Sequence, residues 1–166
     1  SFFDELKPKY SINFLEESKP LGTVGALNKL KIKLDGSLIL TNCDTLITCN
    51  YNDMIDFHQD NNYDITLVGS MINYKVPYGI CKIAEEGRLV SIQEKPEYSY
   101  LVSTGMYVIK SEIIKLIPNN RQMDMTDLID KVMSSGGNVG VYPISENSWL
   151  DTGDWKEYKE VIDKLT

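Results

Sequence analysis

Two aspartates that follow apolar stretches are the first candidates for chemistry in this sequence. Asp44 comes three residues after the end of a strand expected at 38–41, and Asp151 comes after the last expected strand, 139–144. An aspartate after a strand often bonds its own backbone in an Asx turn. Two carboxylates at two strand ends can instead hold one Mg²⁺, whose remaining positions are filled by phosphate oxygens and water. The pattern therefore favours a magnesium site of Asp44 and Asp151, with the turn as the alternative for Asp44 alone.

Two glycines lie in the segment 21–25 (LGTVG), between an expected strand and an expected helix. Glycine lets a backbone approach a ligand closely, and a helix N-terminus favours an anion. A structural turn is the simpler explanation of the same two glycines. The segment is therefore a weak candidate for anion binding when taken alone.

A charged pair, Glu94 and Lys95, ends another expected strand directly before a proline. Glu94 could accept hydrogen bonds from sugar hydroxyls, and Lys95 could neutralise a phosphate. The alternative is an exposed ion pair, which contributes little to stability. Gly79 could let a ligand pass close to the backbone, since it has no side chain.

The elements that must position these residues alternate along the chain. Strands are expected at 11–17, 38–41, 63–72, 104–110 and 139–144, a hairpin of 78–84 with 88–93, and helices at 24–30, between Asn50 and Asn61, at 111–117, 124–133 and 154–165. No low-complexity linker interrupts them, so we expect one α/β domain over residues 1–166 with a mixed, mainly parallel sheet. In such sheets ligands bind at the carboxyl ends of the strands, where Asp44 is expected.

Composition argues against several classes of protein. The net charge of −7 and the lack of a Lys/Arg cluster disfavour a nucleic-acid partner. No run of about eighteen apolar residues predicts a membrane span, and the first residues, SFFDELKPKYS, lack a signal-peptide pattern. The three cysteines form no C-x-x-C pair and favour reduced thiols of a cytoplasmic protein. His58 is the only histidine, and no hydrolytic triad can be assembled around it.

The order of the short motifs along the chain resembles the sugar-1-phosphate nucleotidylyltransferase family. The motifs are Glu17, PLGTVG at 20–25, NCD at 42–44, PYG at 77–79, EKP at 94–96, TGMY at 104–107 and WLDTG at 149–153. The stretches TNCD, VPYGICKI and STGMYVIK are most similar to bacterial mannose- or glucosamine-1-phosphate guanylyltransferases, which supply cell-surface polysaccharide pathways. The resemblance implies a Rossmann-like three-layer sandwich, the nucleotide-diphospho-sugar transferase fold.

The resemblance also implies a reaction and a role for each motif. An oxygen of a hexose 1-phosphate would attack the α-phosphorus of an NTP, GTP being favoured, and pyrophosphate would leave. Asp44 and Asp151 would be the catalytic residues and would ligate Mg²⁺. The implied contacts are with the nucleotide for Leu21, Gly22 and Thr23, and with the sugar phosphate for Gly79, Glu94, Lys95, Thr104 and Gly105.

Two features depart from the family pattern. Ser103 stands where the family usually has asparagine, which leaves the identity of the sugar open. The Gly-rich loop with Arg and Pro-Lys-Pro that binds the triphosphate does not occur. We therefore expect the N-terminally incomplete, C-terminal portion of such an enzyme, without nucleotidyl transfer of its own; NDP-sugar formed from GTP would contradict this. The missing strand would leave a bare sheet edge, through which homo-oligomers could form.

Two other classes of function remain open. The first is a non-catalytic module that binds a sugar nucleotide or sugar phosphate, which Mg²⁺-dependent binding without turnover would favour. The second is a glycosyltransferase of the related nucleotide-sugar-dependent fold. Those enzymes usually carry Asp-x-Asp at the strand end, whereas this chain has a single carboxylate in NCD at 42–44, so this interpretation ranks last.

Overall fold

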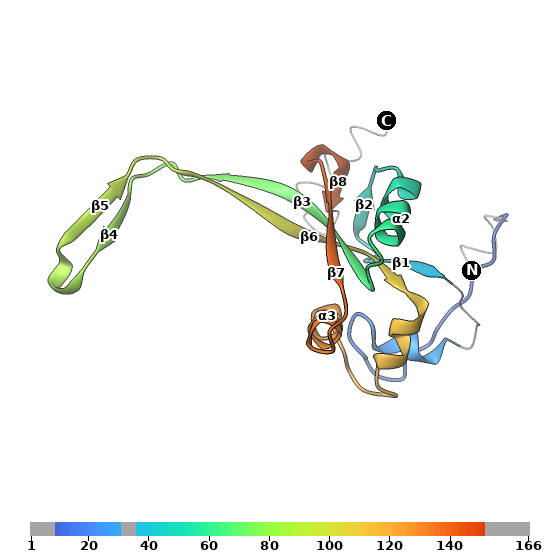
Figure 1. The fold of residues 1–166 in the computed structure, drawn as a ribbon. Coiled ribbons are helices and arrows are strands. Elements are labelled where there is room, and N and C mark those ends of the chain that lie inside the picture. Colours follow the sequence, from blue (N-terminus) through green and yellow to red (C-terminus); the bar gives the residue numbers. More distant parts are fainter. Residues whose placement is uncertain (1–8, 31–35, 152–166) are drawn as a thin grey trace.

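The core of the protein is a four-stranded sheet, seen in a computed structural model that describes residues 9–30 and 36–151 (Figure 1). Its strands follow the spatial order β1-β6-β3-β7. Their bounds are Ser37–Thr41 for β1, Ile65–Lys75 for β3, Glu97–Lys110 for β6 and Val139–Ile144 for β7. The sheet has helices on both sides, as the α/β pattern predicted.

The sheet is mixed, but its antiparallel share is larger than the sequence predicted. β6 runs antiparallel to both β1 and β3, and only β3 and β7 are parallel among these strands. A parallel pair needs a crossover of a dozen or more residues, usually with a helix. The segment between β3 and β6 is a hairpin instead, so the expected mainly parallel sheet is corrected to a mainly antiparallel one.

Two small sheets complete the strands. β2 (Thr45–Ile47) pairs antiparallel with β8 (Trp149–Asp151), and β4 (Ile80–Ile83) pairs with β5 (Leu89–Gln93). The β4–β5 hairpin was predicted, and its turn places Glu86 and Gly87 at positive φ. The β2–β8 pair was not predicted, because three residues are too few for an alternating pattern to show.

The described helices are two α-helices and four short 3-10 turns. They are α2 (Tyr51–Asp60), α3 (Met125–Ser134), η1 (Gly25–Lys29), η2 (Glu85–Gly87), η3 (Ser111–Leu116) and η4 (Glu146–Ser148). None of these helices is long and apolar enough to cross a membrane. The side chain of Asn50 caps α2 by accepting from the backbone N–H of Asn52 at 3.0 Å, as the sequence predicts for Asn50 or Asn52.

Three expected elements have a different outcome. The helices expected at 24–30 and 111–117 are the 3-10 turns η1 and η3. The strand expected at 11–17 is wrong, because this segment is mostly exposed irregular chain. Its alternating pattern has no partner strand to bury it. The helix expected at 154–165 lies outside the described residues.

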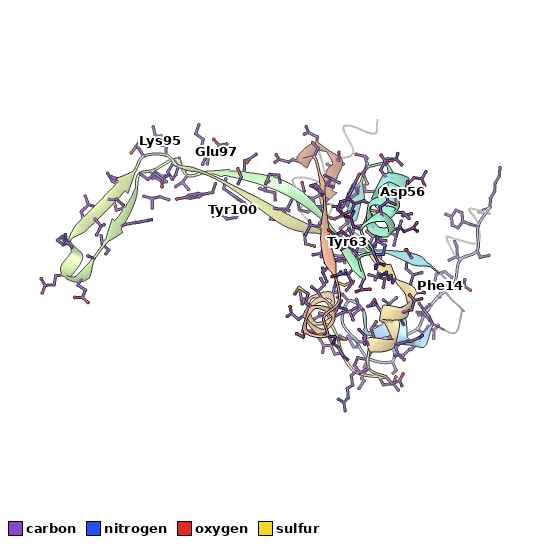
Figure 2. All side chains as sticks on the ribbon, in the orientation of Figure 1. Phe14, Asp56, Tyr63, Lys95, Glu97 and Tyr100 are labelled. Carbon is purple, nitrogen blue, oxygen red and sulfur yellow. The ribbon has the colours of Figure 1, made fainter. Side chains whose placement is uncertain are left out.

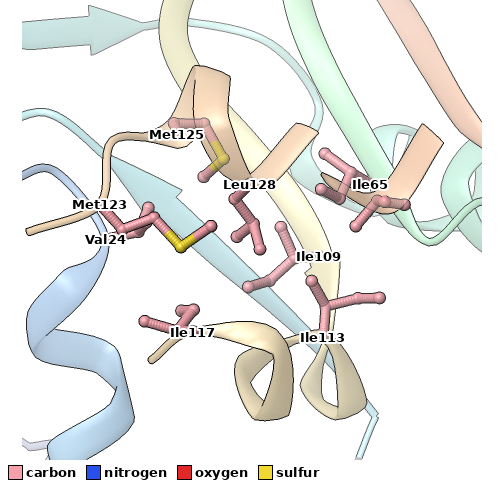
Figure 3. Packing of buried hydrophobic residues seen from close by; sticks show 9 residues of the cluster. Val24, Ile65, Ile109, Ile113, Ile117, Met123, Met125 and Leu128 are labelled. Atoms are coloured by element: carbon pink, nitrogen blue, oxygen red, sulfur yellow. The ribbon is translucent and has the colours of Figure 1, made fainter. Parts of the chain in front are cut away.

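Two apolar cores lie on opposite faces of the sheet. The first packs α3 and η3 on the sheet through Ile65, Ile109 and Leu128, and Figure 3 shows this cluster from close by. The second packs α2 on the other face through Met54, Val68 and further residues. Neighbouring positions of a strand point to opposite faces, so each central strand supplies both cores. The result is a three-layer α/β arrangement.

Beyond the body, β3 and β6 continue as a two-stranded ribbon that carries β4 and β5; we call residues 71–101 the arm. Figures 1 and 2 show the arm projecting away from the body, with Lys95 and Glu97 far along it. β7 follows β3 only as far as Ser70, and β1 follows β6 only from Met106, so the arm has just its own two strands. The register shifts between Leu67 and Gly69, where the ribbon leaves the body.

His58 of α2 is buried beneath the sheet, with 1% of its surface exposed. Its Nδ1 lies 2.8 Å from the hydroxyl of Thr66, and its Nε2 has no hydrogen-bond partner. Burial lowers the pKa of His58, and the nearby charge of Lys110 lowers it further, while Asp64 acts in the opposite direction. The imidazole is therefore neutral in the folded protein under conditions in which an exposed histidine begins to protonate.

We expect the free energy of unfolding to fall as the pH drops through about 6.5. The unfolded chain protonates His58 there, whereas the folded chain does so only at a lower pH, so protons favour unfolding in this window. His58→Gln should be less stable at neutral pH but should show a flatter pH dependence between the two pKa values. Urea denaturation at a series of pH values measures this, with Asp56→Asn on the same helix as the control. An unchanged slope in His58→Gln would contradict the assignment.

Candidate functional site

A pocket of about 500 Å³ opens beside β1, between the 20–25 loop and the start of α3. Its walls come from segments far apart in the sequence: the loop, η1, the end of β1, the middle of β6 and the first turn of α3. The lining residues are Thr23, Val24, Leu27, Leu40, Thr41, Asn42, Gly105, Tyr107, Asp124, Met125 and Thr126. Three of the predicted motifs, at 20–25, 42–44 and 104–107, therefore reach one cavity.

The first wall is the 20–25 loop, which is held on the N-terminus of α3 by reciprocal hydrogen bonds. The backbone N–H of Thr23 donates to Oδ1 of Asp124 at 2.9 Å. The hydroxyl of Thr23 accepts from the backbone N–H of Met125 at 2.8 Å. A helix start leaves N–H groups unpaired, and Thr23 satisfies one of them from a distant part of the chain. The side chain of Thr23 thus has a structural role beside its predicted contact with a nucleotide.

The neighbouring residues of the loop have equally defined positions. Gly22 has φ +77°, and a Cβ there would lie 2.6 Å from Oδ1 of Asp124, so only glycine fits. Leu21 is 1% exposed, and its carbonyl accepts from the backbone N–H of Met123 at 2.9 Å. Because the carbonyl of Leu21 already accepts this hydrogen bond, the predicted backbone contact of Leu21 with a nucleobase must leave that bond in place.

The opposite wall is the turn between β1 and β2, which crosses β6 at Thr104 and Gly105. The backbone N–H of Asn42 donates to the carbonyl of Gly105 at 3.1 Å, and the hydroxyl of Thr45 donates to the carbonyl of Thr104 at 3.0 Å. Gly105 has φ +83°, and a Cβ there would lie 2.6 Å from Nδ2 of Asn42. A side chain at Gly105 would therefore displace the turn that carries Asp44.

The two aspartates lie on neighbouring segments at this turn. Asp44 is exposed and directly precedes β2. The β2–β8 register places Thr45 opposite Asp151, so the backbones of the two aspartate segments run side by side. No group of three or more His, Cys, Asp or Glu gathers anywhere in residues 9–30 and 36–151. A two-carboxylate arrangement suits Mg²⁺, which takes only one or two protein carboxylates and keeps phosphate oxygens and water as its other ligands.

Thr104 points away from the pocket. Its side chain is buried at 3% exposure, and its hydroxyl donates to the carbonyl of Val68 at 2.9 Å. The hydroxyl of Thr104 is thus bonded within the sheet, and only its backbone borders the turn at Asn42. On the same strand, Ser103 donates to the hydroxyl of Tyr107 at 3.2 Å, and Tyr107 lines the pocket.

The predicted sugar-phosphate residues of the arm lie together but away from the pocket. A Cβ on Gly79 would be 3.0 Å from Oε2 of Glu94, so these two residues adjoin each other. Nζ of Lys95 is 4.0 Å from Oε1 of Glu94, and both side chains are well exposed. Figure 2 shows Lys95 on the arm, apart from the body. The structure therefore brings Gly22, Thr23, Gly105 and the turn of Asp44 together, and it keeps Gly79, Glu94 and Lys95 apart from them.

Sequence reasoning missed the part of the pocket that α3 supplies. Asp124 was expected only to begin a helix, yet it binds the backbone of Thr23 and lines the cavity. Its partner lies 101 positions away in the sequence, so no local pattern could link them. Tyr107 was visible in the TGMY motif, but its alternation predicted only a strand.

Comparison with known proteins finds similarity along almost the whole chain. Residues 2–166 match the family described as Nucleotidyl transferase. A mannose-1-phosphate guanylyltransferase of Mycobacterium tuberculosis is 26% identical over 151 residues, which are 89% of this chain and 42% of the relative. A glucose-1-phosphate adenylyltransferase of Acetivibrio thermocellus is 30% identical over 138 residues, 74% of this chain and 31% of the relative. The chain thus spans less than half the length of these relatives.

A solved structure shows the same fold. The crystal structure of HddC from Yersinia pseudotuberculosis superposes with a TM-score of 0.70 at 22% sequence identity. The match covers 99% of this chain and 73% of that chain. The three-layer α/β fold implied by the sequence is therefore confirmed at the level of architecture.

Loss of the Thr23 hydroxyl should destabilise the protein through the start of α3. We expect Thr23→Ala to lower the free energy of unfolding by about 1 kcal/mol, as for other lost helix caps. Thr126→Ala is the matched control, since Thr126 is exposed on the first turn of α3 beside the same pocket and should change stability by less than about 0.5 kcal/mol. Urea denaturation measures both. Equal losses for the two variants would show that Thr23 does not cap α3.

Proposed function

Because the chain belongs to the nucleotidyl transferase family, we propose that it serves the transfer of a nucleotidyl group from an NTP to a hexose 1-phosphate. A phosphate oxygen of the sugar attacks the α-phosphorus of the NTP, and pyrophosphate leaves as the NDP-sugar forms. The observation that carries the proposal is the pocket, because the 20–25 loop, Gly105 and the turn of Asp44 meet there. Positioning and charge neutralisation supply most of the catalysis in such a displacement.

The pocket suits the nucleoside part of the substrate. Its volume of about 500 Å³ is that of an ordinary small-molecule site. Val24, Leu27 and Leu40 offer apolar surface to a planar base, and the rigid loop at Gly22 allows close backbone approach. The apolar wall requires no particular base, so discrimination must come from the polar lining.

GTP is the favoured nucleotide. Asp124 lines the pocket, and its carboxylate, which already accepts from the backbone N–H of Thr23, can accept further hydrogen bonds. Guanine presents two adjacent N–H donors on one edge, which a carboxylate can accept together. Adenine and uracil do not present this pair. A mannose-1-phosphate guanylyltransferase among the relatives supports the same choice, and we take mannose 1-phosphate as the first sugar to test.

Asp44 and Asp151 would hold Mg²⁺ beside the pocket. Their segments adjoin through the β2–β8 register, and two carboxylates fit this ion's usual share of protein ligands. When bound, Mg²⁺ would neutralise charge on the phosphates of both substrates. The backbone hydrogen bond from Asn42 to Gly105 anchors the turn that carries Asp44 to β6, so the backbone of this segment is fixed before any ligand enters.

Titration calorimetry tests the proposal directly. GTP, ATP, UTP and GDP-mannose are titrated into the protein with and without Mg²⁺, and release of pyrophosphate is followed with mannose 1-phosphate as acceptor. We expect Mg²⁺-dependent binding of GTP and GDP-mannose, weaker binding of ATP and UTP, and no release of pyrophosphate by this chain alone, since the sequence lacks the Gly-rich loop that would bind the triphosphate. Absence of binding for every nucleotide and sugar nucleotide would overturn the function, and equal binding of the three NTPs would overturn only the preference for GTP.

Asp44→Asn should abolish the Mg²⁺-dependent part of nucleotide binding. Even residues outside a metal's own ligands contribute about 10–100-fold to metal affinity, so a lost ligand should weaken Mg²⁺-dependent binding by at least about 100-fold. The exposed Asp130→Asn on α3 is the control. If Asp44→Asn instead lowers the free energy of unfolding while leaving nucleotide binding intact, the carboxylate stabilises the turn and does not bind metal.

A further inference from the structure

The strand β5 (Leu89–Gln93, LVSIQ) is an unprotected edge at the end of the arm. All five of its residues are exposed. It pairs with β4 along one edge, and no other strand among the described residues pairs with its second edge. The strand contains no charged residue and no proline, the two devices by which proteins usually keep exposed edges from pairing. β4, in contrast, carries Lys82.

The side chains of β5 expose apolar surface on both faces of the ribbon. Val90 is 59% and Ile92 is 61% exposed on one face, and Leu89 is 56% exposed on the other. Ile83, which pairs with Leu89 across the hairpin, is 68% exposed. A two-stranded ribbon is at best marginally stable in water, and additional strands are what normally stabilise it. The end of the arm therefore exposes the free strand edge and the apolar side chains that further strands would normally cover.

The charge distribution favours a second copy of the chain as the partner. The arm carries four basic and four acidic side chains, so the whole net charge of −7 lies on the rest of the chain. Two bodies would repel each other, whereas two arms would not. The segment 89–101 spans on the order of 40 Å when extended, and Figure 1 shows that it holds β5 away from the body. Contact at β5 keeps the two bodies farther apart than the Debye length of about 8 Å at physiological salt, so salt screens the repulsion between them.

We propose that two copies of this chain pair antiparallel along their β5 edges, giving a four-stranded sheet in the order β4-β5-β5-β4. A two-fold axis through the middle of the strand places Ser91 opposite its own copy, where a small uncharged side chain causes no repulsion. The same register sets Val90 opposite Ile92 of the second copy. Cross-strand pairs of β-branched residues are favourable in sheets. The contact is thus self-complementary in backbone, shape and charge.

The pairing differs from the self-association expected from the sequence. That expectation concerned a bare edge of the central sheet, where β1 is the terminal strand among those described. β1 lies beside the pocket, on the acidic body. The β5 contact leaves the pocket open in each copy, and it does not depend on the proposed function, since association is measured without any ligand.

Opposite charges placed at Ser91 test the pairing. We expect the wild-type chain to be a concentration-dependent dimer by sedimentation equilibrium. Ser91→Lys and Ser91→Glu each set like charges across the axis and should weaken the dimer by up to about fivefold. An equimolar mixture of the two variants should associate more tightly than either variant alone, because each mixed pair has opposite charges. Cys81→Lys, on β4 at the far edge of the same hairpin, is the matched control and should leave the dimer intact.

Amide exchange locates the contact independently. The amides of 89–93 should exchange more slowly as the protein concentration rises, while those of β1 should not change. A monomer at every concentration would overturn the proposal. So would exchange of the 89–93 amides that does not slow with protein concentration, because pairing with β4 alone would then account for their protection. A dimer that both Ser91 variants leave intact but Ile39→Lys on β1 disrupts would place the contact on the central sheet instead.

Discussion

The fourteen-residue strand β6 is the constraint on which the rest of the structure depends. Within one uninterrupted strand it pairs with β1 and β3, supplies both apolar cores, borders the pocket at Gly105 and forms half of the arm. A strand keeps a strict alternation of faces, so these tasks are not independent. A one-residue slip of β6 would turn Ile109 out of one core and remove Gly105 from the turn at Asn42.

The pocket owes its shape to hydrogen bonds in each of which a backbone group takes part. The 20–25 loop is held by Asp124 and Met125, and the turn of Asp44 is held by the carbonyls of Thr104 and Gly105. Both glycines at the walls have positive φ and no room for a side chain. The cavity is therefore largely formed before a ligand binds, which reduces the ordering that binding must offset.

The sequence was informative wherever structure is local. The cap at Asn50, the amphipathic α3 and the turn at Glu86 and Gly87 all follow from residues a few positions apart. The antiparallel direction of β6 could not be predicted. Alternation of apolar and polar residues identifies a strand, but it does not show which strand pairs with it or in which direction. The β2–β8 pair joins residues about a hundred positions apart over three residues each, and the Thr23–Asp124 contact is equally distant. For the site, the structure brings Gly22, Thr23, Gly105 and the Asp44 turn together, whereas Gly79 and Glu94 lie apart on the arm.

The register shift between Leu67 and Gly69 marks the point at which the arm leaves the body. A bulge bends a strand and increases its twist, and Gly69 has no room for a Cβ beside Val141. The extra residues of this bulge lie on β6, because Leu67 pairs with Tyr107 and Gly69 pairs with Ser103, so that residues 104–106 face the single residue Val68. Gly105 on the wall of the pocket therefore belongs to the same irregularity at which the ribbon leaves the body.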